Sequence, residues 1–249
     1  MKVTLLQQDI VWANPAANRA AAGKAIEAAP PSDLYVLPEM WSTGFAVQPE
    51  GIAEPEQSES LQWMQDIASR MDAAIAGSIG VCTEEGYRNR LYFVKPGGDM
   101  AVYDKHHLFG YGGEHLHYTA GQERIVEEWR GVRFLLQVCY DLRFPVWSRS
   151  REDYDAIIYV ANWPTSRLEA WRTLLKARAI ENQCYVLGVN RVGTDPICQY
   201  SGGTAFVDPY GRAEECSDNE VAALTAEINM ERLNDFRRKF PVLKDRDNW

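Results

Sequence analysis

Three residues of this 249-residue chain have side chains suited to nucleophilic catalysis, and each follows a strand-like segment: Glu39, Lys105 and Cys139. A thiol is a weak nucleophile until a neighbouring base removes its proton, and a carboxylate in apolar surroundings can be that base near neutral pH. Attack on an amide or nitrile carbon places negative charge on oxygen or nitrogen, which a fixed cation stabilises. The three residues are therefore candidates for the base, the cation and the nucleophile.

Cys139 lies between the apolar segment 133–138 and a helix-like segment that begins at Pro145. The turn expected between them would expose the sulfur to free backbone N–H groups, which lower the pKa of a thiol and can hold an oxyanion. The backbone N–H of Tyr140 is the expected oxyanion donor beside Lys105. Taken alone, a cysteine after a hydrophobic strand is more often an inert core residue.

The other two candidates also follow strand-like segments. Glu39 follows the apolar run 34–37 after a single proline, Pro38, and Lys105 comes at the end of the hairpin expected over 89–104. Because the ends of parallel strands meet at one edge of an α/β sheet, we expect both side chains near Cys139. Each residue has an ordinary alternative, since Glu39 could cap a turn and Lys105 could be a solvated hairpin end.

The elements that must position these residues alternate between strands and helices. Further strands are expected at 3–6, 74–81, 156–160, 185–189, 203–208 and 221–228, and helices at 15–29, 59–71, 145–152, 166–182 and 232–240. Ser166 and Glu169 have the spacing of a capping box, and the glycine-rich segment 106–121 is expected to be a surface loop. No linker divides the chain. This order predicts a single α/β domain, for which a layered sandwich would fit.

Composition limits the possible partners. The chain has 26 Lys and Arg against 35 Asp and Glu, a formal charge of −9, which argues against a general affinity for nucleic acid or anionic membranes. Polar residues at 7–9 interrupt the N-terminus before any apolar run is long enough for a signal peptide, and no segment approaches a membrane span. We expect a cytoplasmic protein.

Neither a disulfide framework nor a metal site is expected. The five cysteines are odd in number and scattered, with no C-x-x-C pair. The four histidines lack convincing ligand spacing: His106, His107, His115 and His117. No cofactor is predicted.

Longer sequence blocks around the three candidates resemble a known family. LPEMWSTGF around Glu39, YDKHHLF around Lys105 and VCYDLRFP around Cys139 resemble the signature blocks of the nitrilase (carbon–nitrogen hydrolase) superfamily, and RAIENQCYV and YSGGTAFVDPYG resemble its later landmarks. The resemblance implies one four-layer αββα domain over 1–249, with two mixed sheets flanked by helices, and a Glu-Lys-Cys triad at these positions. It also implies that Glu114 helps to position the substrate, and that the chain forms a homodimer or higher homo-oligomer.

Within the superfamily, the blocks DKHHLF, EHLHYTAG and CYDLRFPVWSR most resemble the bacterial omega-amidases. Such enzymes are expected to hydrolyse the terminal amide of small α-keto acid amides, such as α-ketoglutaramate and α-ketosuccinamate, through a cysteine thioester. The carboxylate of such a substrate requires a cation, for which Arg143 and Arg167 are candidates, although either could instead form a structural ion pair. Trp163 and Phe45 are expected as apolar pocket walls.

Three other interpretations stay open at this point. The chain could act on a nitrile, an N-carbamoyl compound or another linear amide. It could be a catalytically silent binding protein with the same fold, because fold alone does not determine function. It could also be a cysteine–histidine hydrolase in which His106 or His107 is the base.

Overall fold

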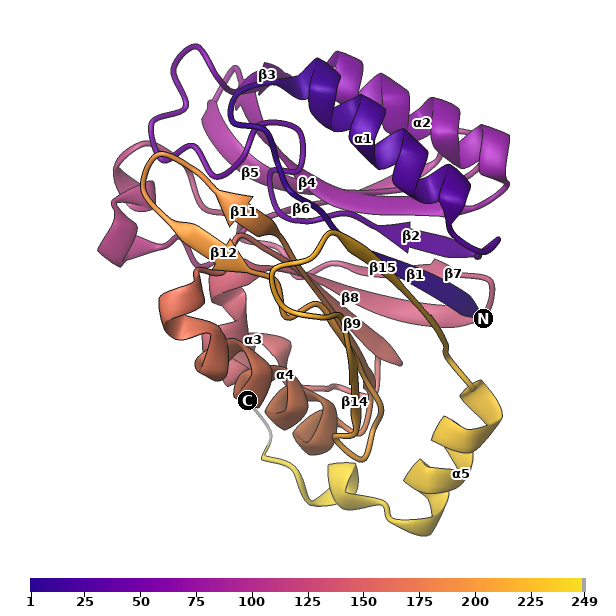
Figure 1. Cartoon of the computed structure of the whole chain (residues 1–249). Helices are drawn as coiled ribbons and strands as arrows, with labels where there is room; N and C mark the ends of the chain where they lie inside the picture. The colour runs from indigo at the N-terminus through magenta and orange to yellow at the C-terminus, as the bar shows by residue number, and fades with distance from the viewer. Residues whose placement is uncertain (248–249) are drawn as a thin grey trace.

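Two β-sheets lie face to face between layers of helices in the computed structural model, which describes residues 1–247 (Figure 1). The first sheet has the order β15 (Ala222–Glu227), β1 (Lys2–Gln7), β2 (Leu34–Val36), β4 (Ala74–Thr83), β5 (Gly86–Val94) and β6 (Met100–Asp104), with β3 (Glu54–Pro55) paired to β4. The second has the order β14 (Ala213–Glu215), β13 (Ala205–Val207), β10 (Tyr185–Asn190), β9 (Ala156–Ala161), β8 (Val132–Val138) and β7 (Val126–Trp129). A separate hairpin joins β11 (Val192–Thr194) to β12 (Gln199–Ser201).

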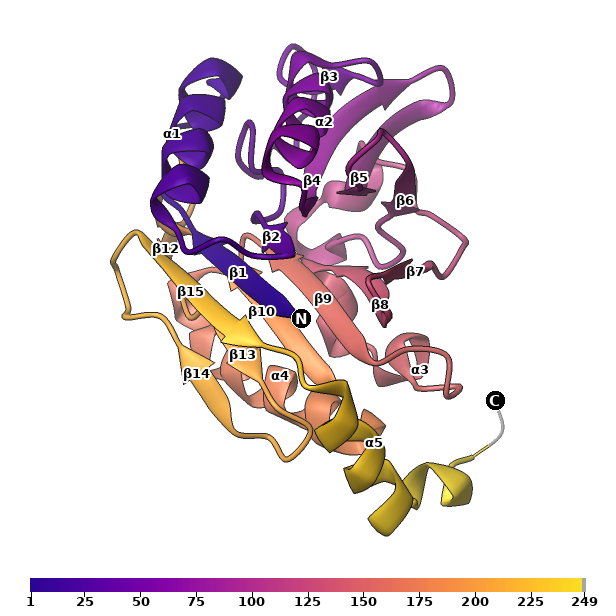
Figure 2. The ribbon, with the colours of Figure 1, turned by 90° about the vertical axis from the view of Figure 1, so that its right-hand side faces the viewer.

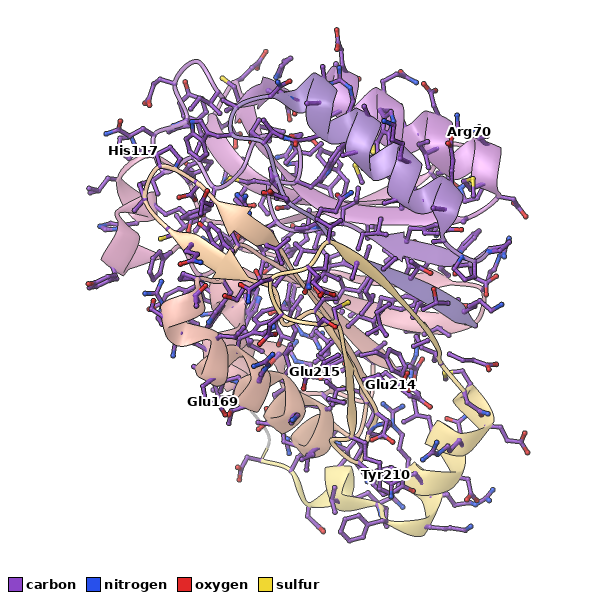
Figure 3. All side chains as sticks on the ribbon, viewed as in Figure 1. Arg70, His117, Glu169, Tyr210, Glu214 and Glu215 are labelled. Atoms are coloured by element: carbon purple, nitrogen blue, oxygen red, sulfur yellow. The ribbon has the colours of Figure 1, made fainter. Side chains whose placement is uncertain are left out.

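The helices cover the outer faces of the sheets. The elements are α1 (Pro15–Ala28) and α2 (Glu59–Met71) on the first sheet, α4 (Leu168–Asn182) with the short α3 (Pro145–Ser148) on the second, and α5 (Met230–Lys239) beyond the sheets (Figures 1 and 2). Charged side chains such as Arg70 and Glu169 lie on the outer surface of these helices (Figure 3). The predicted αββα arrangement of two mixed sheets flanked by helices is confirmed.

Successive side chains along a strand point alternately into the space between the two sheets and towards the helices. In β4, Ala74 and Ala76 pack between the two sheets, whereas Ile75 and Ile79 pack against α1 and α2. This follows from the two-residue period of a strand, in which successive side chains point to opposite faces. Strands buried on both faces therefore read as continuous apolar runs, which is why the sequence could predict them.

Most predicted elements are present, and two details differ. The Asn14 side chain caps α1 at the N–H of Ala17, as its type suggests. The capping box predicted from Ser166 and Glu169 is wrong, because a 3₁₀ turn (Thr165–Arg167) precedes α4 and makes Ser166 part of the turn. Helix α3 ends at Ser148, short of the predicted residue 152, because the backbone turns extended at the next residue.

The sheet topology brings several strand ends to one edge. Strand β2 is parallel to β4, and two antiparallel steps from β4 through β5 give β6 the same direction. Strands β8 and β9 are also parallel. The first sheet thus delivers the residues after β2 and β6 to this edge, and the second sheet delivers those after β8 and β9.

Within residues 1–247, no helix has the length and apolar character needed to span a bilayer.

Gly121→Ala should lower the free energy of unfolding by about 1–3 kcal/mol, the usual cost of overpacking. A Cβ at Gly121 would lie 2.2 Å from the carbonyl oxygen of Asp104, so the backbone around one of these residues must move to accommodate alanine. As a control, Gly23→Ala in α1 has only Trp63 nearby, at 3.9 Å, and should raise this free energy by about 0.5–1 kcal/mol. Urea unfolding measures both, and a wild-type value for Gly121→Ala would contradict the close approach.

Candidate active site

The three residues expected to meet do meet in one pocket. Glu39, Lys105 and Cys139 all line it, and the first two are almost fully buried. The Lys105 Nζ lies 2.9 Å from Glu39 Oε1. The structure therefore brings together a carboxylate, an ammonium and a thiol from both sheets.

Hydrogen bonds fix the Glu39 carboxylate on both oxygens. Its Oε1 accepts from Asn89 Nδ2 at 2.8 Å, and its Oε2 accepts from the backbone N–H of Asn162 at 2.8 Å. The Asn162 side chain also donates to the Glu39 backbone carbonyl at 2.5 Å. Because Asn162 follows β9 in the second sheet, these bonds join the two sheets at the site.

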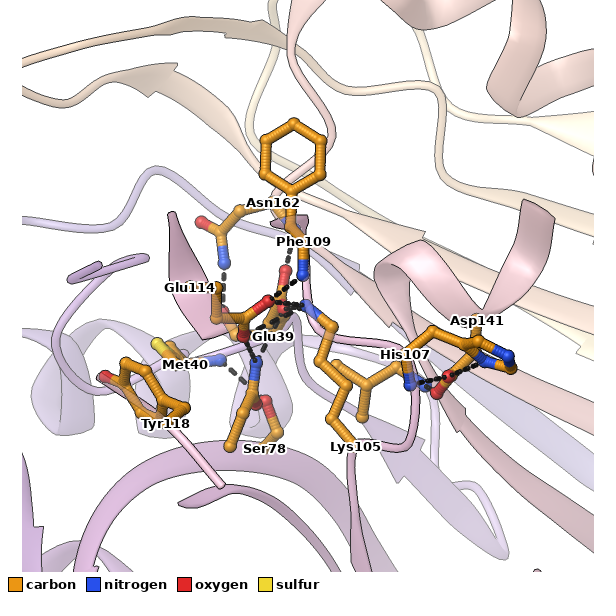
Figure 4. A network of polar contacts seen from close by, with 12 residues as sticks. Glu39, Met40, Ser78, Lys105, His107, Phe109, Glu114, Tyr118, Asp141 and Asn162 are labelled. Atoms are coloured by element: carbon orange, nitrogen blue, oxygen red, sulfur yellow. Dashed lines mark hydrogen bonds and ion pairs between the residues drawn. The ribbon is translucent and has the colours of Figure 1, made fainter. Parts of the chain in front are cut away.

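Glu114 is the second carboxylate on the lysine. Its Oε2 lies 2.9 Å from Lys105 Nζ and accepts from the backbone N–H of Phe109 at 2.6 Å, and its Oε1 accepts from Asn89 at 3.2 Å (Figure 4). Burial disfavours charge on Lys105, but Glu114 and Glu39 outweigh this and raise the pKa of the lysine above its usual value. Burial raises the pKa of Glu114, followed by the charge of Glu39, while Lys105 opposes the rise. The lysine stays charged.

Cys139 begins the 3₁₀ turn Cys139–Arg143 with a φ of 45°, a strained conformation for a residue with a side chain. Burial and then the charge of Glu39 raise the pKa of its thiol well above the ordinary value, and Lys105 offsets only part of this. The prediction that the turn lowers this pKa is therefore wrong. The resting thiol is protonated, so attack requires a base.

The backbone N–H of Tyr140 has no acceptor among residues 1–247, and Tyr140 lines the pocket beside Cys139. An unpaired N–H directly after a nucleophile can stabilise an oxyanion. The N–H of Tyr140 thus lies where an oxyanion donor is needed, and the role itself stays a prediction.

The pocket walls include all four of the other predicted residues: Phe45, Arg143, Trp163 and Arg167. The guanidinium carbon of Arg143 lies 4.9 Å from the centre of the Trp163 ring, and that of Arg167 lies 5.3 Å from the Phe109 ring. Neither arginine has a carboxylate partner in the described part of the chain. Both cations are thus available to an anionic ligand.

Sequence reasoning missed two parts of the site. The Asn89 side chain donates to both carboxylates. The only indication of this role in the sequence is a polar residue within a buried strand. The hairpin of β11 and β12 adds a further wall, which contains Asp195, Ile197, Cys198 and Tyr200. Its strands have three residues each, too short to show a periodic pattern.

The histidines lie outside the pocket. His106 stacks on Trp147 and donates from Nδ1 to the Gly121 carbonyl at 2.6 Å, and His107 binds Asp141. Neither ring is among the described residues that line the pocket. His115 lies near Gly110, and the ring of His117 lies 3.7 Å from Glu50. This geometry does not support a cysteine–histidine pair.

Comparisons with known proteins agree with this geometry. The carbon-nitrogen hydrolase family model matches residues 2–238. "Omega-amidase YafV" of Yersinia enterocolitica is 47% identical, with 100% of this chain and 98% of that protein covered. A 2-oxoglutaramate amidase of Bacillus subtilis is 34% identical, with 98% and 96% covered.

A solved structure is also similar over its whole length. The CN-hydrolase superfamily protein XC1258 of Xanthomonas campestris, which carries an arsenic adduct in its active site, superimposes with a TM-score of 0.97 at 42% identity. The alignment covers 100% of this chain and 98% of that chain. The chain therefore belongs to the carbon-nitrogen hydrolase family.

Proposed function

We propose that the protein is an omega-amidase that hydrolyses the terminal amide of small α-keto acid amides to the α-keto acid and ammonia. The observation that carries the proposal is one pocket lined by the buried Glu39 and Lys105, by Cys139, and by two arginines that lack carboxylate partners among residues 1–247. The names of relatives that are 34–47% identical over the full chain support the same substrate class. α-Ketoglutaramate and α-ketosuccinamate are the substrates to test first.

In the first half of the reaction, the Cys139 sulfur bonds to the amide carbon while its proton passes to Glu39. The base is required because the thiol is protonated at rest. The oxyanion accepts hydrogen bonds from the Lys105 ammonium and from the Tyr140 N–H. The carbon–nitrogen bond then breaks, and Glu39 returns the proton to nitrogen, so that ammonia leaves and a thioester remains.

In the second half, water attacks the thioester carbon and Glu39 accepts a proton from it. The bond from carbon to sulfur then breaks, Glu39 returns its proton to the sulfur, and the acid leaves, so that the Cys139 thiol and the Glu39 carboxylate are both restored. Glu114 and Asn89 hold the lysine and the first carboxylate in place throughout, through bonds of 2.8–3.2 Å. Glu114 is fully buried and is not among the described residues that line the pocket, so we assign it an indirect part in positioning the amide group, through Lys105.

The substrate carboxylate binds at the arginine side of the pocket. Arg143 or Arg167 pairs with it, while Trp163 and Phe45 contact the carbon chain between carboxylate and amide. A cation at a fixed distance from Cys139 selects substrates whose amide lies at the end opposite the carboxylate. Only a substrate of matching length places its amide carbon at the sulfur.

We further propose a cytoplasmic homodimer. All five cysteines are free thiols, which is typical of a reducing compartment. Val146 on α3 and Ile180 on α4 are 66% and 53% exposed, on the two helices that follow the nucleophile, where the family resemblance implies pairing. Apolar side chains exposed on adjacent elements are typical of an interface.

Cys139→Ala should abolish ammonia release from α-ketoglutaramate, and Glu39→Gln should lower kcat/KM by about 10³-fold or more, because each removes a member of one catalytic unit. A coupled ammonia assay measures both. Cys82→Ser, at an exposed thiol, is the matched control and should keep wild-type activity. Full activity in Cys139→Ala would refute the proposal, and full activity in Glu39→Gln would favour a different base.

Replacement of the carboxylate-binding arginine by methionine should raise KM for α-ketoglutaramate by about 10–100-fold, the worth of a charged hydrogen bond. KM for the neutral amide butyramide should change little. Arg143→Met and Arg167→Met are compared with Arg70→Met, whose side chain is 57% exposed on α2. Equal effects on both substrates, or none in either pocket variant, would contradict a carboxylate site here.

The double variant Val146→Glu with Ile180→Glu should convert a dimer into a monomer, since it buries two charges in an apolar contact. Size-exclusion chromatography with light scattering measures the mass. Val11→Glu, 51% exposed on a different face, is the control and should leave the dimer intact. A wild-type protein that is monomeric at micromolar concentration would overturn the assembly.

A further inference from the structure

Asp141, two residues after the nucleophile, is a wholly buried carboxylate without a lysine or arginine partner in residues 1–247. It accepts hydrogen bonds on both oxygens, and Figure 4 shows it beside His107. Oδ2 accepts from Val138 N at 3.0 Å and from the Tyr103 hydroxyl at 2.7 Å. Oδ1 accepts from His107 N at 2.9 Å, and the His107 ring nitrogen Nδ1 lies at the same distance.

The donors come from two parts of the fold that both carry catalytic groups. Val138 ends β8 and directly precedes Cys139 in the second sheet. Tyr103 lies on β6 of the first sheet, two residues before Lys105, and His107 lies two residues after it. One carboxylate therefore joins the backbone of the nucleophile to the backbone of the lysine.

The surrounding contacts determine the direction of these bonds. The Tyr103 hydroxyl accepts from Trp147 Nε1 at 3.1 Å and from His106 N at 3.3 Å, so its single hydrogen is left for Asp141. The His107 ring stacks on Phe144 at 3.9 Å between ring centres. Trp147 and Phe144, which follow the nucleophile turn, thus hold the Tyr103 and His107 side chains in place.

We propose that Asp141 is a positioning residue that sets the separation and orientation of the Cys139 thiol and the Lys105 ammonium. Cys139 has a strained φ of 45°, and the Asp141 bond to Val138 N holds the chain where that strain begins. The bonds to Tyr103 and His107 hold the strand end that carries the lysine. The inference rests on the proposed roles of Cys139 and Lys105, and it assigns no proton transfer to Asp141.

The arrangement requires a carboxylate rather than an amide. A carboxylate only accepts hydrogen bonds, and Asp141 faces donors on both oxygens. In Asp141→Asn the new NH₂ group must face one side. If it faces His107, the backbone N–H of His107 loses its acceptor. If it faces Val138, the backbone N–H of Val138, which precedes the nucleophile, loses its acceptor. Either orientation breaks one link between Cys139 and Lys105.

Asp141→Asn should lower kcat for α-ketoglutaramate by about 100-fold, the effect of a misplacement of roughly 1 Å, with KM changed less than about threefold. Labelling of Cys139 by iodoacetamide should slow in parallel. His107→Ala is the matched control, because it keeps the backbone N–H that binds Asp141. It should lower kcat by less than about tenfold.

A folded Asp141→Asn protein with wild-type kcat and labelling rate, or with only a lower Tm, would overturn the proposal and leave Asp141 a structural role. If this variant does not fold, Tyr103→Phe decides instead. It removes one donor and should lower kcat severalfold at unchanged KM, and a wild-type kcat would overturn the link. Should the wild-type protein lack amidase activity, the proposed function fails, while the labelling rates still test Asp141.

Discussion

A lysine ammonium buried between two carboxylates is the interaction on which the site depends. A buried charge is tolerated only when it is paired and hydrogen-bonded, so Lys105 requires Glu39 and Glu114 as much as they require it. Asn89 donates to both carboxylates and thereby keeps them apart at the distance the lysine spans. The base is consequently held with one oxygen on the ammonium and the other on a backbone N–H, before any substrate enters.

This constraint explains how a thiol that is protonated at rest can still react. Desolvation of the sulfur, and after it the charge of Glu39, raises the pKa of the Cys139 thiol, which keeps the proton on sulfur at rest. The same carboxylate is the acceptor of that proton when sulfur attacks. The charged lysine then faces the negative charge that forms on the substrate. A protonated nucleophile and its base are thus one electrostatic unit, in which no member has its function alone.

Much of this could be predicted from the sequence, for identifiable reasons. Glu39 follows a continuous apolar run and Cys139 a mainly apolar one of strand length, so both could be placed after buried strands and at one edge of a sheet. Asn89 could not be recognised, since its role depends on Glu39 and Glu114, 50 and 25 residues away. The predicted direction of the Cys139 pKa shift was also wrong. The turn suggested backbone N–H donors, which would lower the pKa, whereas desolvation by segments distant in the sequence raises it.

The bonds from Asn162 to Glu39 have a consequence for assembly of the molecule. The base and the lysine follow strands of the first sheet and the thiol follows a strand of the second, so a small shift of one sheet against the other would part them while helices and strands stay formed. Loss of catalysis would therefore precede loss of helix and strand signals during denaturation. Enzymatic turnover is accordingly a reporter of the contact between the sheets, more specific than any spectroscopic measure of secondary structure.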